Sequence, residues 1–441
     1  MEKARFFPGR SFVVLLVLAA IPPAFAVQLK DFVLDQQEWS MTTEAFEKEF
    51  EDQGFEWTSS AKNVARHPGR THFLNKKTEE MEERRPKIGE VEVGETLIKF
   101  VDGEVNRVEV YAYNRGDDGD IREHQFEEKV EMYTKLISKL TGARPQERNT
   151  AREKGLMWSG KTAMYLLEYS ATRASRGSHY RAEYVKLSIA PKRTGLASIG
   201  RQTVKKAVDR SSLRKNVQEK DNGDVVIPNV PMVDQGAKGY CAVAASCRVL
   251  QYYGLDVTQH ELAQTANTTA YGGTNPDEMM DALKKISGKY GVRVSTIDEV
   301  EPRDLIRIIK DYNRTAKKVG AMTVREPSEY YLSYGIFGEF DSEALSTSRS
   351  SSTSYKRFKS EIREHVDQGI PLLWSLMLGV IPEKNIPQLA GGHLRLIIGY
   401  NEETDEIIFS DSWGAGHEEK RMSTADAYAA TTSLRMIKPG R

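Results

Sequence analysis

The sequence predicts an α+β protein built from two domains, and three observations support this. Residues 27–190 contain helix-like and strand-like stretches in the order helix, hairpin, helix, hairpin. After residue 225 the helical stretches come first and the strand-like stretches last. A basic stretch at 191–224, without a sustained apolar face, separates the two halves. Helices and antiparallel strands grouped in this way are typical of the α+β class.

The first 26 residues have the pattern of a secretory signal peptide. Lys3, Arg5 and Arg10 form a basic start, residues 12–21 are all apolar, and Ala24-Phe25-Ala26 is a small-residue cleavage site. The sequence therefore predicts cleavage after Ala26 and a secreted or periplasmic protein. A retained N-terminal anchor is the alternative. Because no other segment is long and apolar enough to span a bilayer, we expect no stable membrane insertion after cleavage.

The front domain, residues 27–190, is expected to form a four-stranded antiparallel sheet with helices on one face. Apolar residues at helical spacing predict a helix at 123–140 that ends at Gly142, and a shorter helix covers 41–53. Asp102-Gly103 lies between two strand-like runs and predicts a hairpin. The four expected strands are 97–101, 105–113, 164–169 and 180–189. Aromatic residues around the first helix are interpreted as core.

The stretch at 191–224 is interpreted as a basic linker. Nine basic and two acidic residues lie from Lys192 to Lys220, and glycines and serines interrupt the run. A solvated tether is the simpler interpretation, and a patch that touches an anionic surface is the alternative. Over the whole chain the formal net charge is zero, which gives no sign of a nucleic-acid partner.

The second domain, residues 225–441, is expected to place helices before a sheet. Helices are expected at 241–253, after Thr258, at 301–313 and at 355–368, and a continuous apolar run at 370–378 predicts a central strand. Residues 341–356 are rich in serine and threonine, and they are interpreted as a mobile surface insert.

Cys241 is the candidate nucleophile. It opens an apolar helix, where free backbone N–H groups and the positive end of the helix dipole favour a thiolate. The same N–H groups can hold an oxyanion after a carbonyl is attacked. Gln235 lies six residues earlier, beyond a loop with two glycines, and is the candidate for a second oxyanion donor.

His393 and Asp411 are the candidate base and orienting acid. His393 starts the strand-like stretch 391–400, and Asp411 ends the next one after a turn at 401–406. In an antiparallel pair the start of one strand lies beside the end of the next. The two side chains are therefore expected to be neighbours at one rim of a sheet. The alternative is a buried structural cysteine, a structural histidine and a turn-capping aspartate.

The chain has only two cysteines, Cys241 and Cys247. Six residues along one helix separate them by ~9 Å, more than a disulfide allows between Cα atoms. We expect Cys247 to be buried and Cys241 to be a free thiol.

Taken in order, Gln235, Cys241, His393 and Asp411-Ser412-Trp413-Gly414 resemble the pattern of the papain-like cysteine peptidases, over about residues 225–441. The acidic third member is typical of the bacterial double-glycine-leader peptidase branch, and Tyr240-Cys241-Ala242 is similar to the staphopain-like enzymes. The resemblance implies a papain-like fold and a thiol hydrolase with Cys241, His393, Asp411 and Gln235 as catalytic residues.

The sequence as a whole therefore predicts a secreted cysteine peptidase that acts on a peptide or protein substrate and uses no cofactor or metal. The alternatives are a cell-wall amide hydrolase or a transglutaminase-like acyltransferase on the same fold, or a non-catalytic binding protein. Nothing in the sequence indicates the oligomeric state, or whether the front domain inhibits, targets or binds substrate.

Overall fold

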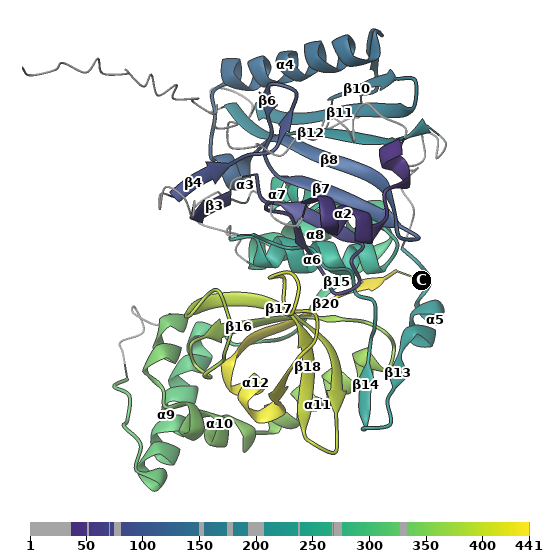
Figure 1. Cartoon of the computed structure of the whole chain (residues 1–441). Coiled ribbons are helices and arrows are strands. Elements are labelled where there is room, and N and C mark those ends of the chain that lie inside the picture. The colour runs from purple at the N-terminus through teal and green to yellow at the C-terminus, as the bar shows by residue number, and fades with distance from the viewer. Residues whose placement is uncertain are drawn as a thin grey trace, which may run out of the picture.

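The computed structural model describes residues 37–50, 53–69, 71–74, 81–149, 154–173, 180–192, 207–236, 239–266, 268, 276–326 and 333–440. The expected signal peptide lies outside these ranges. The described chain forms two domains, and Figure 1 shows the front domain stacked on the helices that begin the second domain.

The front domain is built on one eight-stranded antiparallel sheet with the order β1-β2-β7-β8-β12-β11-β10-β9. Its four central strands are those that the sequence predicted: β7 (Thr96–Val101), β8 (Glu104–Asn114), β11 (Ala163–Arg173) and β12 (Tyr180–Pro191). The prediction of four strands was wrong in number, because short edge strands show too little alternation to be recognised. These are β1 (Glu56–Trp57), β2 (Val64–His67), β9 (Gln146–Glu147) and β10 (Lys154–Ser159).

Helix α4 (Glu123–Thr141) covers one face of this sheet (Figure 1). It buries Phe126, Tyr133 and Ile137, and Gly142 ends it in the left-handed conformation, as its sequence predicted. Smaller elements complete the domain: η1 (Gln37–Ser40), α2 (Thr43–Phe50), α3 (Arg115–Asp118), and the hairpins β3 (Thr71–Leu74) with β4 (Met81–Arg84) and β5 (Lys87–Ile88) with β6 (Val91–Glu92).

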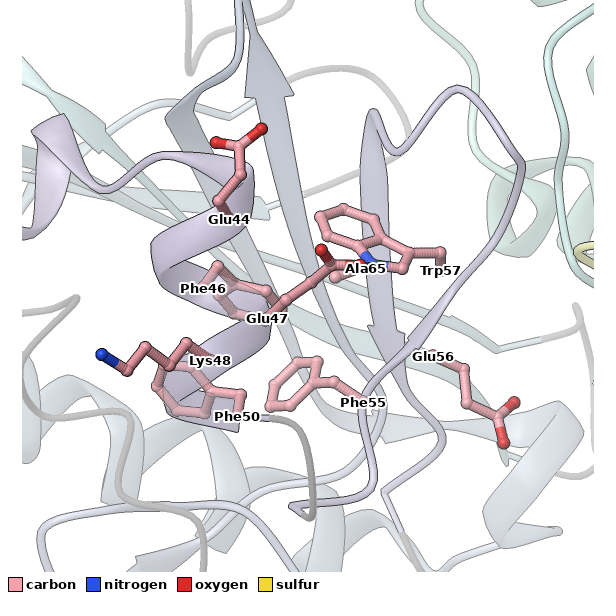
Figure 2. Close-up of a pocket in the computed structure, with 9 residues that line it drawn as sticks. All are labelled: Glu44, Phe46, Glu47, Lys48, Phe50, Phe55, Glu56, Trp57 and Ala65. Carbon is pink, nitrogen blue, oxygen red and sulfur yellow. Dashed lines mark hydrogen bonds between the residues drawn. The ribbon is translucent and has the colours of Figure 1, made fainter.

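The aromatic residues around α2 pack as core, as expected. Phe46 and Phe50 are buried and stack with their ring centroids 4.8 Å apart, and Trp57 lies edge-on to Phe46 at 5.7 Å. They line a hollow of about 510 Å³ that Figure 2 shows from close by. All residues that line it belong to the front domain, so it is not part of the site described below.

The second domain places its first helices before its main sheet. The helices are α6 (Cys241–Tyr252), α7 (Gln259–Thr265), α8 (Pro276–Tyr290), α9 (Pro302–Val319), α10 (Ser342–Ser350), α11 (Thr353–Val366) and α12 (Thr424–Ala430), with η6 (Tyr334–Glu339) before α10. The strands are β13 (Gln218–Glu219), β14 (Asp224–Val226), β15 (Val292–Glu299), β16 (Leu372–Leu378), β17 (Gly391–Asn401), β18 (Glu406–Ser410), β19 (Lys420–Ser423) and β20 (Thr431–Pro439).

This second sheet has the order β13-β14-β17-β16-β20-β15, and β18 pairs with β17 while β19 pairs with β18. Apolar clusters cover both of its faces. Leu373 of β16 packs in the cluster of α6, α7 and α8, whereas Leu372 and Trp374 pack in the cluster of α9, α10 and α11. A strand that is buried on both faces has no polar alternation, which explains why the run at 370–378 is apolar except at Ser375.

Residues 341–356 were interpreted from the sequence as a mobile insert, and this was wrong. Most of them form α10, which begins at the N-cap Asp341 and buries Ala344 and Leu345. Arg349 is buried and donates to the backbone oxygens of Ala429 and Thr431, each at 2.9 Å. The small serine side chains allow the helix to pack closely, so low complexity here reflects packing and not disorder.

The linker prediction also changes. Residues 193–206 lie outside the described ranges, but residues 207–226 pack on the second domain. Leu213, at the end of α5 (Arg210–Leu213), is buried in its core, η4 (Arg214–Asn216) follows, and β14 pairs with β17. The many basic residues of this stretch suggested a solvated tether, although it contains the strand β14 and the buried Leu213.

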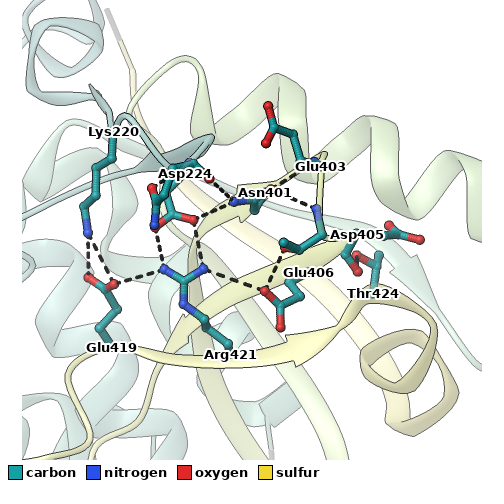
Figure 3. A network of polar contacts seen from close by, with 11 residues as sticks. Lys220, Asp224, Asn401, Glu403, Asp405, Glu406, Glu419, Arg421 and Thr424 are labelled. Carbon is teal, nitrogen blue, oxygen red and sulfur yellow. Dashed lines mark hydrogen bonds and ion pairs between the residues drawn. The ribbon is translucent and has the colours of Figure 1, made fainter.

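A polar network holds β14 to the end of the sheet (Figure 3). Asp224 is buried, and it accepts hydrogen bonds from Arg421 Nη1 at 2.8 Å and from Asn401 Nδ2 at 2.9 Å. Lys220 and Glu419 form a further ion pair at 3.3 Å. Residues from Lys220 onward are therefore held to the second sheet.

Candidate active site

Cys241 is the first residue of α6. Tyr240 before it provides no side-chain cap, whereas residues 242–250 of the helix are all buried. Cys241 itself is only partly buried. An apolar helix with one partly exposed thiol at its start is the arrangement that the sequence predicted.

Cys247 lies on the same helix and is fully buried. Its Sγ lies 3.2 Å from the backbone oxygen of Val257. Burial raises the pKa of the Cys247 thiol above its usual range. Because it is enclosed and kept as a thiol, Cys247 is not a candidate nucleophile.

His393 and Asp411 meet at the rim of the sheet. In the hairpin of β17 and β18, Leu396 pairs with Ser410, so His393 near the start of β17 lies close to the residue that follows β18. His393 Nε2 lies 2.7 Å from Asp411 Oδ1, and neither side chain is exposed. The hairpin thus brings the two residues together, as its sequence predicted.

The electrostatics of this pair favour a charged imidazole. Burial by itself lowers the pKa of His393, but the hydrogen bond with Asp411 and the nearby Asp411 and Cys241 side chains raise it to about 9. Burial would raise the pKa of Asp411, but the hydrogen bond to His393 and the charges of His393 and Arg395 lower it to about 2. At neutral pH the pair is therefore an imidazolium and a carboxylate, with Cys241 beside the ring.

Trp413 covers the imidazole. Its ring stacks on His393 with centroids 4.4 Å apart and an interplanar angle of 15°. A flat aromatic ring in this position shields the contact between His393 and Asp411 from water and favours a cationic imidazole.

Arg395 is a member of the site that the sequence reasoning missed. Its Nε donates to Asp411 Oδ2 at 2.6 Å, and its Nη1 donates to Glu383 Oε1 at 3.0 Å. The guanidinium is fully buried and lies 4.6 Å from the ring centroid of Phe409. Asp411 Oδ1 also accepts the Ser412 backbone N–H at 2.8 Å, so both oxygens are engaged and the carboxylate has a fixed orientation. The sequence feature that could have identified Arg395 is a charged residue two positions after His393, and thus on the same face of an otherwise apolar strand.

Arg248 was missed as well. It lies seven residues after Cys241 on α6 and is buried, and burial lowers the pKa of its guanidinium to about 10. Its Nη1 donates to the backbone oxygen of Asp411 at 2.8 Å, and its Nε donates to that of Pro231 at 2.8 Å. Arg248 thus fastens the helix that carries Cys241 to the strand end that carries Asp411. An arginine within an apolar helix was the available signal.

Gln235 lies against the residues next to Asp411. Its backbone N–H donates to the Ser412 oxygen at 2.9 Å, and its side chain is buried. Its Oε1 has no hydrogen-bond partner within the part of the chain that the structure describes. Residues 237–238, between Gln235 and Cys241, lie outside that part. The structure thus joins His393 and Asp411 by a direct contact and places Gln235 beside them through the Ser412 backbone, while Cys241 is close enough to affect the pKa of His393.

Among the described residues, no group of three or more histidine, cysteine, aspartate or glutamate side chains could hold a metal ion. Nor does any helix in those ranges have the length and apolar character needed to cross a membrane.

Helices before an antiparallel sheet, a cysteine at the first helix start, and a histidine–aspartate pair beside it define a class, the papain-like cysteine peptidases. Comparison with known families agrees with this class: residues 227–436 match the model of the Peptidase_C39 like family. The second domain is therefore a papain-like cysteine peptidase domain, similar to that family over the matched residues, and the protein is a cysteine-type peptidase.

Among solved structures, the chain is similar to xylellain, a cysteine protease from Xylella fastidiosa. The two are 13% identical, the match covers 54% of this chain and 92% of that chain, and the TM-score is 0.27. No curated protein matches the chain.

Proposed function

We propose that this peptidase is exported and hydrolyses peptide bonds in peptides or proteins through Cys241, His393 and Asp411, with Gln235 as an oxyanion donor. The observation that carries the proposal is the buried 2.7 Å contact between His393 and Asp411 beside Cys241. A cationic imidazole stabilises a neighbouring thiolate, and the thiolate is the nucleophilic form of cysteine.

In the first half of the reaction, Cys241 Sγ attacks the substrate carbonyl carbon and the carbonyl electrons move to oxygen. The Gln235 amide and the backbone N–H of Cys241 hold this oxyanion. His393 then gives its proton to the amide nitrogen as the C–N bond breaks, which releases an amine and leaves a thioester on Cys241.

In the second half, the neutral His393 takes a proton from water as the water attacks the thioester. The acid product leaves, and the thiolate and the imidazolium are restored. Asp411 keeps the imidazole in one orientation and stabilises its charge, and Arg395 and Arg248 hold Asp411 in place through its carboxylate and its backbone.

Export rests on the sequence of residues 1–26, which we propose to be a cleaved signal peptide. We further propose two domains in the exported chain, residues 27–192 and 207–441, joined by 193–206. The pairing of β14 with β17 and the burial of Leu213 of α5 in the core of the second domain support this placement of the boundary.

The test is labelling with a thiol-directed peptidase inhibitor, followed by mass spectrometry of the labelled peptide. We expect covalent modification at Cys241 and none at Cys247, which is the internal control. Rates on a denatured protein, on purified peptidoglycan and on an amine acceptor then separate a peptidase from a wall hydrolase and from an acyltransferase. A labelled enzyme that cleaves peptidoglycan but no protein would reject the proposed substrate class.

A further inference from the structure

The front domain reaches the segment that carries Gln235. Arg66, on β2 of the front domain, places Nη1 3.0 Å from Asp234 Oδ2 in the second domain. The same guanidinium donates from Nε to Glu95 Oε1 at 2.7 Å. Arg66 thus binds a carboxylate from each domain, and one of the two belongs to the residue immediately before Gln235.

This contact is buried between the domains. Arg66 is 8% exposed and Glu95 is 2% exposed. Glu95 Oε2 lies 3.0 Å from His260 Nε2 on α7, and the ring of Tyr111 lies 4.4 Å from that of His260. A buried charge pair of this kind is well shielded from solvent and holds its members in a defined geometry.

Arg66 also lies against the residue after Gln235. Gly236 has a positive φ of 67°, and a side-chain carbon there would lie 2.7 Å from Arg66 Nη2. The Gly236 backbone N–H donates to Asp234 Oδ1 at 2.7 Å, so one carboxylate oxygen closes the turn while the other faces Arg66. Both neighbours of Gln235 are therefore held against a side chain of the front domain.

We propose that Arg66 is a positioning residue for catalysis, and that the front domain works as part of the enzyme by holding the turn that presents Gln235 to the oxyanion. The inference rests on the proposed function of Gln235. It distinguishes the front domain from an inhibitory pro-region, whose removal would raise activity, because loss of this contact lowers turnover.

The experiment uses the full chain and compares kcat and KM on a peptide substrate. Arg66→Lys keeps the positive charge but cannot reach Glu95 and Asp234 with the same planar fork. Asp234→Asn is a second variant that keeps an acceptor for the Gly236 N–H and weakens the pair with Arg66. The matched control is Arg115→Ala, because Arg115 Nη1 also crosses between the domains, to the Thr268 oxygen at 2.7 Å, without touching residues 234–236.

Removing an oxyanion donor lowers kcat by about 10²–10³, so a loosened donor is expected to lower it by less, roughly tenfold, with KM unchanged. The decisive measurement is Arg66→Lys in a Gln235→Ala background. If Arg66 acts through Gln235, the second change has little further effect, because the two losses are not additive.

Unchanged kcat in Arg66→Lys and Asp234→Asn, fully multiplicative effects with Gln235→Ala, or an equal loss in Arg115→Ala would each overturn the inference. If Gln235→Ala lowers kcat and Arg66→Lys does not, the inference fails alone. If Gln235→Ala itself leaves kcat unchanged, the proposed role of Gln235 fails first.

Discussion

Replacing Asp411 by asparagine tests the contribution of Arg395 to this site. In the native protein Asp411 accepts from His393 at one oxygen and from Arg395 at the other. An asparagine has one acceptor and one donor group, so whichever way it turns, its NH₂ faces another donor. Although the papain pattern that this sequence resembles has asparagine at this position, we expect the substitution to be harmful in this chain.

The expected loss of unfolding free energy in Asp411→Asn follows from the burial of the ion pair between Asp411 and Arg395. Removing one partner of a buried ion pair costs ~3–5 kcal/mol. Arg395 keeps Glu383 as a partner at 3.0 Å, so we expect the lower end of that range, about 3 kcal/mol. For a domain of this size that corresponds to a fall in Tm of roughly 6–12 °C. Thermal unfolding followed by circular dichroism measures it.

The compensating variant is Asp411→Asn with Arg395→Gln. A glutamine side-chain oxygen can accept from the asparagine NH₂, while the asparagine oxygen still accepts from His393. We expect the double variant to recover at least half of the lost Tm and appreciable activity, with Arg395→Gln alone as the control. A loss below about 1 kcal/mol in Asp411→Asn, or no recovery in the double variant, would refute the reasoning.

Three further outcomes are expected. Cys241→Ala abolishes hydrolysis with the fold intact, as peptide turnover and circular dichroism would show, and Cys247→Ala keeps activity; equal losses would mean that the nucleophile is misassigned. The pKa of His393 is raised from 6.5 to about 9, so the charged imidazole contributes stability that is fully present below pH 6.5 and is lost as the pH rises through about 9. We expect kcat to fall over the same upper pH range. A pH–rate profile that already falls near pH 6.5 would contradict this. Trypsin is expected to cut within 193–206 before it cuts after Arg349, which is buried in α10; early cleavage at Arg349, seen by mass spectrometry of the fragments, would contradict the packing of that helix.

The parts of the structure that the sequence predicted are those whose partners are close along the chain. His393 and Asp411 are joined by a single hairpin, so strand pairing alone brings them together. Asp102 and Gly103 both have positive φ, 53° and 78°, which is the geometry that this dipeptide favours in a two-residue turn. In both cases residues close together along the chain were enough to predict the observed geometry.

The missed members of the site have distant partners. Arg248 contacts the Asp411 backbone, 163 positions away, and nothing in the sequence near Arg248 indicates that partner. A charge within an apolar helix signals that some partner exists, because an unpaired buried charge is too costly, but not which one. Arg395 is closer to Asp411 along the chain, but the residues around it form an apolar strand pattern, which predicts burial of the strand and does not indicate a partner for its one charge.

Composition was misleading at 341–356 for a different reason. Serine is common in disordered segments, but it is also small enough to allow close helix packing. The N-cap residues Asp341 and Ser352 mark the starts of α10 and α11 and were visible in the sequence. Capping chemistry was the better guide there than low complexity.

The burial of Cys247 has a consequence for redox behaviour. If an oxidant converts Cys241 to a sulfenic acid, recovery requires a second thiol to form a disulfide with it. The only other cysteine in the chain is enclosed in the core, ~9 Å further along the same helix and beyond the reach of a disulfide. Repair of the oxidised enzyme must therefore come from a reductant outside the chain, and its working lifetime in an oxidising compartment depends on the thiols that its surroundings supply.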